Sequence, residues 1–136
     1  MVLKVGIIGC GGIANGKHLP ALAQVETVAL VAFCDLELAR AEKAKQKYGT
    51  ADAVVFTDYQ ELLKLDLDAV HVLTPNSSHA PLTIAALEAG CHVMCEKPMA
   101  KTSEEAKAMI TAAEKTGKKL TIGYQNRFRT DSEYLH

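Results

Sequence analysis

The stretch 4–14 constrains the fold of this chain more than any other part of its sequence. It begins as an apolar run, breaks into glycines after Ile8, and then resumes with a helical pattern. The small residues fall at Gly9, Gly11 and Ala14, which is the spacing of a strand–turn–helix unit that binds dinucleotides. Gly9 permits the tight turn, Gly11 lets the backbone approach a pyrophosphate, and Ala14 keeps the helix close to the sheet. The unpaired N–H groups at the helix start would hold the pyrophosphate.

Asp35 strengthens this interpretation. The run from Thr27 to Cys34 is continuously apolar, which is typical of a buried parallel strand. Asp35 closes the run, about twenty residues beyond the glycine turn, where the fold places an acid for the ribose hydroxyls. Aspartate is also a preferred helix N-cap, and both roles are compatible. The carboxylate would repel a 2′-phosphate and Leu36 offers no charge, so we expect NAD rather than NADP, with Arg40 alone able to compensate.

The rest of the chain alternates between strand and helix patterns. Further strands are expected at 53–56, 69–73, 91–95 and 120–124. Helix formers fill 36–48, and further helices are expected at 58–65, from the turn at 74–79 to about 89, and at 102–117. Mostly continuous apolar strands call for a parallel sheet covered on both faces. The fold class is therefore α/β, a Rossmann-type doubly wound sheet in the order 3-2-1-4-5-6.

Local signals give finer expectations for three of the helices. Gly16 and Pro20 should interrupt the first helix, which would then resume to about residue 25. Asp58 with Glu61, and Thr102 with Glu105, are each spaced as a capping box at the start of a later helix.

Unusual polar residues gather where the strands end. Ligands of doubly wound sheets bind outside the carboxyl ends of the strands. Beyond the glycine turn and Asp35, these ends carry Thr74-Pro75-Asn76, Glu96-Lys97-Pro98 and Gln125-Asn126-Arg127. Thr74-Pro75-Asn76 is also a good turn and N-cap, and Glu96-Lys97 is also consistent with a solvated pair. Their common position on one edge favours a ligand site.

Composition excludes several other classes of protein. The chain has 136 residues, 49% hydrophobic and 23% charged, with a net charge of −1, which suits one globular domain without a nucleic-acid partner. It has no apolar run long enough for a membrane span and no signal-peptide core, so we expect a cytoplasmic protein without a membrane partner. The four cysteines include no C-x-x-C pair, so we expect buried thiols and no metal site.

Together these motifs resemble the amino-terminal domain of the glucose-fructose oxidoreductase and inositol dehydrogenase (Gfo/Idh/MocA) family. The resemblance spans essentially the whole chain and includes His18-Leu19-Pro20-Ala21-Leu22 and Gly123-Tyr124-Gln125-Asn126-Arg127-Phe128. Its most specific piece is Glu96-Lys97-Pro98.

The resemblance implies a role for each motif in a hydride transfer between NAD and a CH–OH carbon of a sugar or cyclitol. The cofactor-binding residues would be Gly9, Gly11, Gly12, Ile13 and Ala14 at the pyrophosphate, Asp35 and Leu36 at the adenosine ribose, Thr74, Pro75, Asn76 and His79 beside the cofactor, Glu96 and Lys97 at the nicotinamide ribose, and Gln125. Lys97 would be catalytic, polarising the substrate oxygen or moving its proton. The resemblance also suggests a cis Lys97–Pro98 bond.

Family members continue into a second α/β domain that carries the substrate pocket. We expect residues 1–124 to be the dinucleotide-binding domain and 125–136 to begin the connection to that substrate domain, which is missing here. The chain alone should then bind NAD without turnover, and the full-length protein should be a homo-oligomer. Two alternatives stay open: a non-catalytic dinucleotide-binding module, and an S-adenosylmethionine-dependent methyltransferase. The methyltransferase interpretation leaves Glu96-Lys97-Pro98 unexplained.

Overall fold

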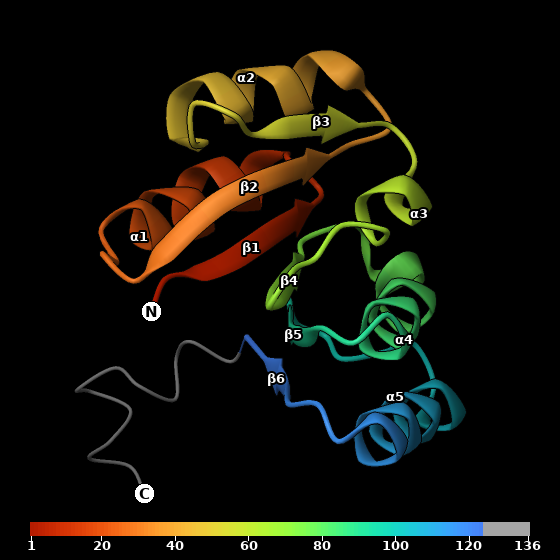
Figure 1. Ribbon diagram of the computed structural model, residues 1–136. Coiled ribbons are helices and arrows are strands. Elements are labelled where there is room, and N and C mark those ends of the chain that lie inside the picture. Colours follow the sequence, from red (N-terminus) through yellow and green to blue (C-terminus); the bar gives the residue numbers. More distant parts are fainter. Residues whose placement is uncertain (124–136) are drawn as a thin grey trace, which may run out of the picture.

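The computed structural model describes residues 1–123 and contains one six-stranded sheet (Figure 1). Its order is β3-β2-β1-β4-β5-β6, and every neighbouring pair is parallel, as the sequence predicts. The strands are β1 (Leu3–Ile8), β2 (Val28–Cys34), β3 (Val54–Phe56), β4 (Ala69–Val72), β5 (His92–Cys95) and β6 (Leu120–Ile122). All six carboxyl ends therefore lie along one edge of the sheet.

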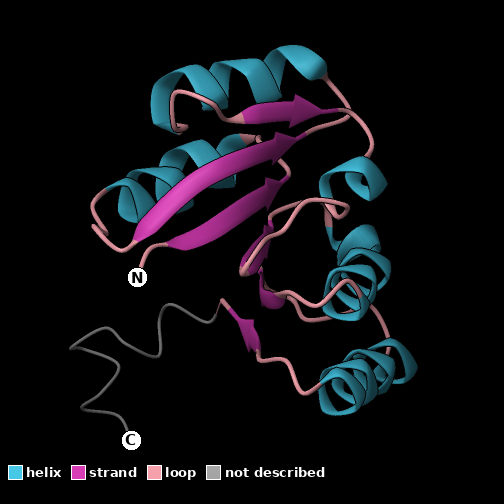
Figure 2. Ribbon diagram, in the orientation of Figure 1, coloured by secondary structure: helices cyan, strands magenta, loops and turns pink. Residues whose placement is uncertain are grey.

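Helices cover both faces of this sheet (Figure 2). They are α1 (Leu19–Ala23), α2 (Leu38–Tyr48), α3 (Tyr59–Leu62), α4 (His79–Glu88) and α5 (Ser103–Thr116), with a π-helical segment η1 (Ala14–His18) and a 3₁₀ turn η2 (Asn76–Ser78). Two apolar cores result, because successive strand residues point to opposite faces. Ile7 packs with α1 and α2, whereas Ile8 belongs to the core formed with α4 and α5.

A bulge in β2 changes which of its residues share a face of the sheet. Val5 pairs with Leu30 but Gly6 pairs with Ala32, so Val31 is the extra residue. Leu30 and Phe33 consequently enter the same core, although they are three residues apart. An ordinary strand would place them on opposite faces.

The predicted break in the first helix is wrong. Helical turns run from residue 12 to residue 23, and the segment η1 widens instead of ending the helix. The Leu19 N–H donates to the Ala14 carbonyl five residues back, which is π-helical hydrogen bonding. Pro20 follows at once, and its missing N–H lets the hydrogen-bond ladder change register there without losing a donor.

The two predicted capping boxes form only in part. Asp58 Oδ1 accepts from the Gln60 N–H at 2.9 Å, and Glu61 pairs with Lys64 instead of reaching back to Asp58. Helix α3 also ends at Leu62, short of the predicted limit. Thr102 Oγ1 accepts from the Glu105 N–H at 3.1 Å as expected, but the Glu105 carboxylate accepts from the N–H of Lys101.

Candidate functional site

The glycine turn after β1 is held against the turn that follows β4. Gly9 has a φ of 99°, a left-handed conformation that favours glycine. A Cβ built on it would lie 2.7 Å from the carbonyl carbon of Leu73, so no side chain fits there. The Gly9 N–H donates to the Cys34 carbonyl at 2.8 Å, which ties the turn to the end of β2 as well.

Asp35 joins the glycine turn to the start of α2. Its Oδ2 accepts from the Cys10 N–H at 2.9 Å, and its Oδ1 accepts from the Glu37 N–H at 2.9 Å. Glu37, not Asp35, occupies the N-cap position of α2, so the carboxylate closes a local turn ahead of the helix. Each carboxylate oxygen keeps further lone-pair capacity that can accept from a hydroxyl.

A cleft of about 600 Å³ opens between these elements at the carboxyl edge of the sheet. Its volume lies within the range of small-molecule sites. Eight of the predicted site residues line it: Gly9, Gly11, Gly12, Ile13, Asp35, Leu36, Thr74 and Pro75. A Cβ on Gly12 would stand in open space, and one on Gly11 would meet only a flexible arginine side chain, so a ligand can approach the backbone closely.

The other predicted site residues lie outside the cleft lining. Ala14 is fully buried in the core beneath the loop, as its packing role requires, and Asn76 is exposed at the start of η2. His79 is 1% exposed. Glu96 and Lys97 follow the next strand along the edge, and Gln125 lies outside the described residues.

The cleft also contains residues that the sequence analysis did not select. They include Glu37, Thr57, Tyr59, Ser78 and Leu82. Thr57 and Tyr59 follow β3, so the rule that ligands bind at the carboxyl ends of strands could have found them. Leu82 lies inside α4, and only the packing of that helix brings it to the cleft.

Arg40 lines the cleft beside the glycine turn. Its Nη1 is 3.9 Å from the position that a Cβ on Gly11 would take. Its Nε is 3.1 Å from Glu37 Oε2, and both side chains are more than half exposed. The Arg40 guanidinium therefore lies near the glycine turn and is paired with the Glu37 carboxylate.

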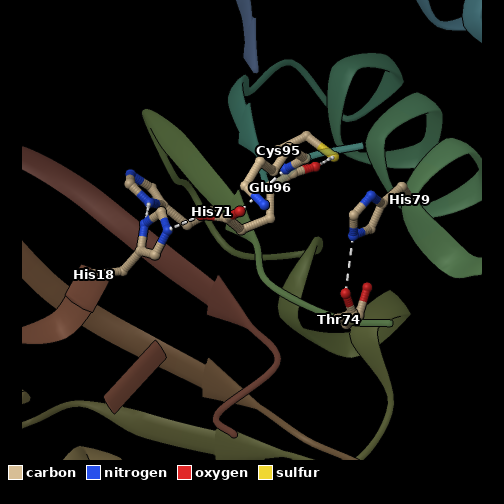
Figure 3. A network of polar contacts seen from close by, with 7 residues as sticks. His18, His71, Thr74, His79, Cys95 and Glu96 are labelled. Carbon is tan, nitrogen blue, oxygen red and sulfur yellow. Dashed lines mark hydrogen bonds and ion pairs between the residues drawn. The ribbon is translucent and has the colours of Figure 1, made fainter. Parts of the chain in front are cut away.

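His79 links the ends of β4 and β5 (Figure 3). Its Nε2 lies 2.8 Å from the Thr74 carbonyl, and its Nδ1 lies 2.7 Å from the Pro98 carbonyl. The Ser78 hydroxyl is 2.6 Å from Thr74 Oγ1 and completes the turn after β4. The histidine predicted to flank a cofactor thus lies between the turns that follow β4 and β5, within hydrogen-bond distance of a carbonyl oxygen in each.

A second polar cluster lies beside the end of β5 (Figure 3). His18 Nε2 is 2.6 Å from Glu96 Oε1, and His18 Nδ1 is 3.4 Å from His71 Nδ1. Burial, with a smaller contribution from His18, lowers the pKa of His71 to about 4. The second oxygen of Glu96 accepts from the Lys97 N–H at 3.1 Å. The Lys97 side chain is exposed, and the Lys97–Pro98 bond is cis, as the resemblance suggested.

The thiols near the cleft are unsuited to nucleophilic chemistry. All four cysteines are free and buried, as predicted. Burial and the nearby Asp35 carboxylate raise the pKa of Cys10 to about 12 and that of Cys34 to about 11. Within residues 1–123, no helix is long and apolar enough to cross a membrane, and no cluster of three potential ligands could hold a metal ion.

The chain is similar to known oxidoreductases over almost its whole length. Residues 3–124 match the model of the oxidoreductase family with an NAD-binding Rossmann fold. D-glucoside 3-dehydrogenase of Escherichia coli K12 is 43% identical over 98% of this chain, and inositol 2-dehydrogenase of Salmonella typhimurium LT2 is 39% identical over 94%. The chain spans 38% of the length of each of these relatives.

A solved structure agrees with these matches. The 3-ketoreductase KijD10 of Actinomadura kijaniata, in complex with NADP and TDP-benzene, superposes with a TM-score of 0.91 at 28% identity, over 99% of this chain and 41% of that one. The comparisons do not support the methyltransferase alternative, because the relatives are dehydrogenases and reductases. The chain belongs to the Gfo/Idh/MocA oxidoreductase family and forms its NAD-binding Rossmann domain.

Proposed function

We propose that this chain binds NAD in the cleft as the cofactor-binding part of a dehydrogenase that acts on a CH–OH carbon of a sugar or cyclitol. One observation carries the proposal: Asp35 accepts from the Cys10 N–H inside the glycine turn. That bond sets the acid for a ribose and the loop for a pyrophosphate side by side on one cleft. The names of the glucoside and inositol dehydrogenases support the substrate class.

The residues of the cleft fit the adenosine half of the cofactor. The helix that starts at residue 12 would offer its first N–H groups to the pyrophosphate, where the helix dipole favours an anion. The remaining lone pairs of Asp35 would accept from ribose hydroxyls, and Leu36, 91% exposed, would cover the adenine. Thr74 and Pro75 would form the opposite wall.

Glu96 and Lys97 are proposed to serve the nicotinamide half. When bound, NAD supplies the hydride chemistry, and the protein supplies position and electrostatics. The Lys97 ammonium, exposed at the edge of the sheet, would polarise the substrate oxygen or move its proton. We further propose that residues 1–124 form the dinucleotide-binding domain, that 125–136 begin the connection to a substrate domain, and that the whole protein is a homo-oligomer.

Calorimetric titration with NAD and NADP tests the cofactor choice. We expect NAD to bind more tightly, because a 2′-phosphate would meet the Asp35 carboxylate while Arg40 is engaged by Glu37. Asp35→Ala should narrow the preference, whereas Asp66→Ala, whose carboxylate pairs with Lys4, should leave it unchanged. Tighter binding of NADP by the unmodified chain would refute the assignment.

An assay of NADH formation with inositol and simple sugars tests the reaction. Turnover requires a substrate held at about 3–3.5 Å from the reacting carbon. Because the chain spans only 38% of its relatives, we expect NAD binding with negligible oxidation by these residues alone. If a protein that also carries the proposed substrate domain showed negligible turnover, the non-catalytic dinucleotide-binding module would be favoured instead.

A further inference from the structure

The contact between His18 and Glu96 joins two parts of the site that are far apart in the sequence. The His18 side chain is 11% exposed and that of Glu96 is 9% exposed, and their 2.6 Å contact is short even for a charge-assisted hydrogen bond. A carboxylate oxygen only accepts, so the proton at His18 Nε2 points at Glu96. A buried carboxylate needs such a donor, because its burial is otherwise costly.

His18 lies at the end of η1, on the helix that starts in the glycine turn. The π-helical turn adds a residue before His18 and so sets the direction in which its ring points. Glu96 follows β5, and its other oxygen accepts from the Lys97 N–H at 3.1 Å. One imidazole and one carboxylate therefore connect the helix that starts in the glycine turn to the backbone of Lys97.

His71 supports the ring of His18 from β4. The two Nδ1 atoms are 3.4 Å apart, and the rings meet edge to face at 81° with centroids 5.5 Å apart. One Nδ1 donates to the other, which fixes the ring plane of His18 and keeps Nε2 directed at Glu96. Gly123 also packs closely against Glu96, because a Cβ on it would lie only 3.2 Å from the same Oε1.

We propose that His18 is a positioning residue that fixes Glu96, and through it the Lys97 backbone, relative to the helix that holds the pyrophosphate. His71 acts as its support. This inference rests on the proposed function, since it assigns Glu96 and Lys97 to the nicotinamide half of the cofactor. Its consequence is that His18 matters for a ligand that reaches Lys97 and not for one that ends at the pyrophosphate.

Binding of NADH and of ADP to the 136-residue chain separates these two halves. ADP carries the adenosine and the pyrophosphate but lacks the nicotinamide ribose. For His18→Leu we expect NADH to bind about tenfold more weakly, as loss of a hydrogen bond to a charged group predicts, and ADP to bind within about twofold of the original affinity. His18→Gln should restore most of the NADH affinity, because the glutamine Nε2 can take the place of the imidazole Nε2.

His92→Gln is the matched control. This histidine lies on β5, and its Nδ1 accepts from the Lys119 N–H, so the ratio of NADH to ADP affinity should not change. An unchanged ratio in His18→Leu, a parallel loss of both ligands, or failure of His18→Gln to recover NADH binding each overturns the positioning role. If the unmodified chain binds neither ligand, the proposed function fails and this inference fails with it.

Discussion

Acid should destabilise this domain through His71. Burial and the neighbouring His18 lower the pKa of His71 from 6.5 to about 4 in the folded chain. Between these two pH values the unfolded chain binds a proton that the folded chain does not bind. The stability that His71 contributes is therefore complete above pH 6.5 and is lost as the pH falls towards 4.

The size of the effect follows from the two pKa values. One pKa unit corresponds to about 1.4 kcal/mol, so the full loss is about 3 kcal/mol, of which about 2 kcal/mol is lost between pH 7.5 and pH 5. That is a large fraction of the free energy of unfolding of a typical domain, which is roughly 5–15 kcal/mol. With a urea m-value of about 2 kcal/mol/M, the unfolding midpoint should fall by about 1 M over this interval.

Urea unfolding of the original chain and of His71→Gln at pH 7.5 and at pH 5 measures this contribution. Other groups titrate in both proteins, so the informative quantity is the difference between the two pH dependences. We expect the midpoint of His71→Gln to fall by about 1 M less than that of the original chain. The reasoning would be refuted if the unfolding midpoints of the two proteins fell equally between pH 7.5 and pH 5. An NMR titration in which the His71 ring protonates near pH 6.5 would also refute it.

Two further predictions concern the glycine turn. Gly9→Ala should lower the free energy of unfolding, measured in urea, by about 3 kcal/mol, because the alanine would have an unfavourable φ and its Cβ would clash with the Leu73 backbone. Gly12→Ala is the control: its Cβ would stand in open space, so the free energy of unfolding should change by less than about 0.5 kcal/mol. Cys10 should resist iodoacetamide at pH 8 in the folded chain, since its pKa is about 12 and it is 1% exposed, and should react readily in urea; fast alkylation of the native chain would contradict its burial.

The sheet order follows from signals that are local in the sequence. Each apolar run is separated from the next by a helical pattern, and a parallel sheet with crossing helices is the arrangement that buries such runs on both faces. The bulge at Val31, in contrast, could not be predicted from local sequence signals. A continuous apolar run hides which residues share a face, and only pairing with β1 decides it.

The positions of the candidate site residues could be predicted where one rule places them. They could not be predicted where the packing of helices decides them. Asp35 stands at the end of a strand, so its place on the edge was predictable, but its bond to the Cys10 N–H depends on how β1 and β2 align. The predicted break at Gly16 was wrong, because Gly and Pro can also be accommodated by a π-helical turn that continues the helix, and local sequence signals do not distinguish the two outcomes. That same turn directs His18 towards Glu96, so their contact was hidden as well.

Three side chains make contacts at the carboxyl edge of the sheet, where its backbone hydrogen-bond ladder stops. Asp35 connects the ends of β1 and β2, His79 lies between the ends of β4 and β5, and His18 connects the helix that starts in the glycine turn to the end of β5. Loops beyond a sheet edge otherwise lack the hydrogen bonds that hold the strands, and ordering them on ligand binding costs conformational entropy. Contacts made by these three side chains restrict the loops beforehand and so reduce the entropy that a ligand at this edge must offset. More of its contact energy then remains available as affinity, which is the advantage of preorganisation.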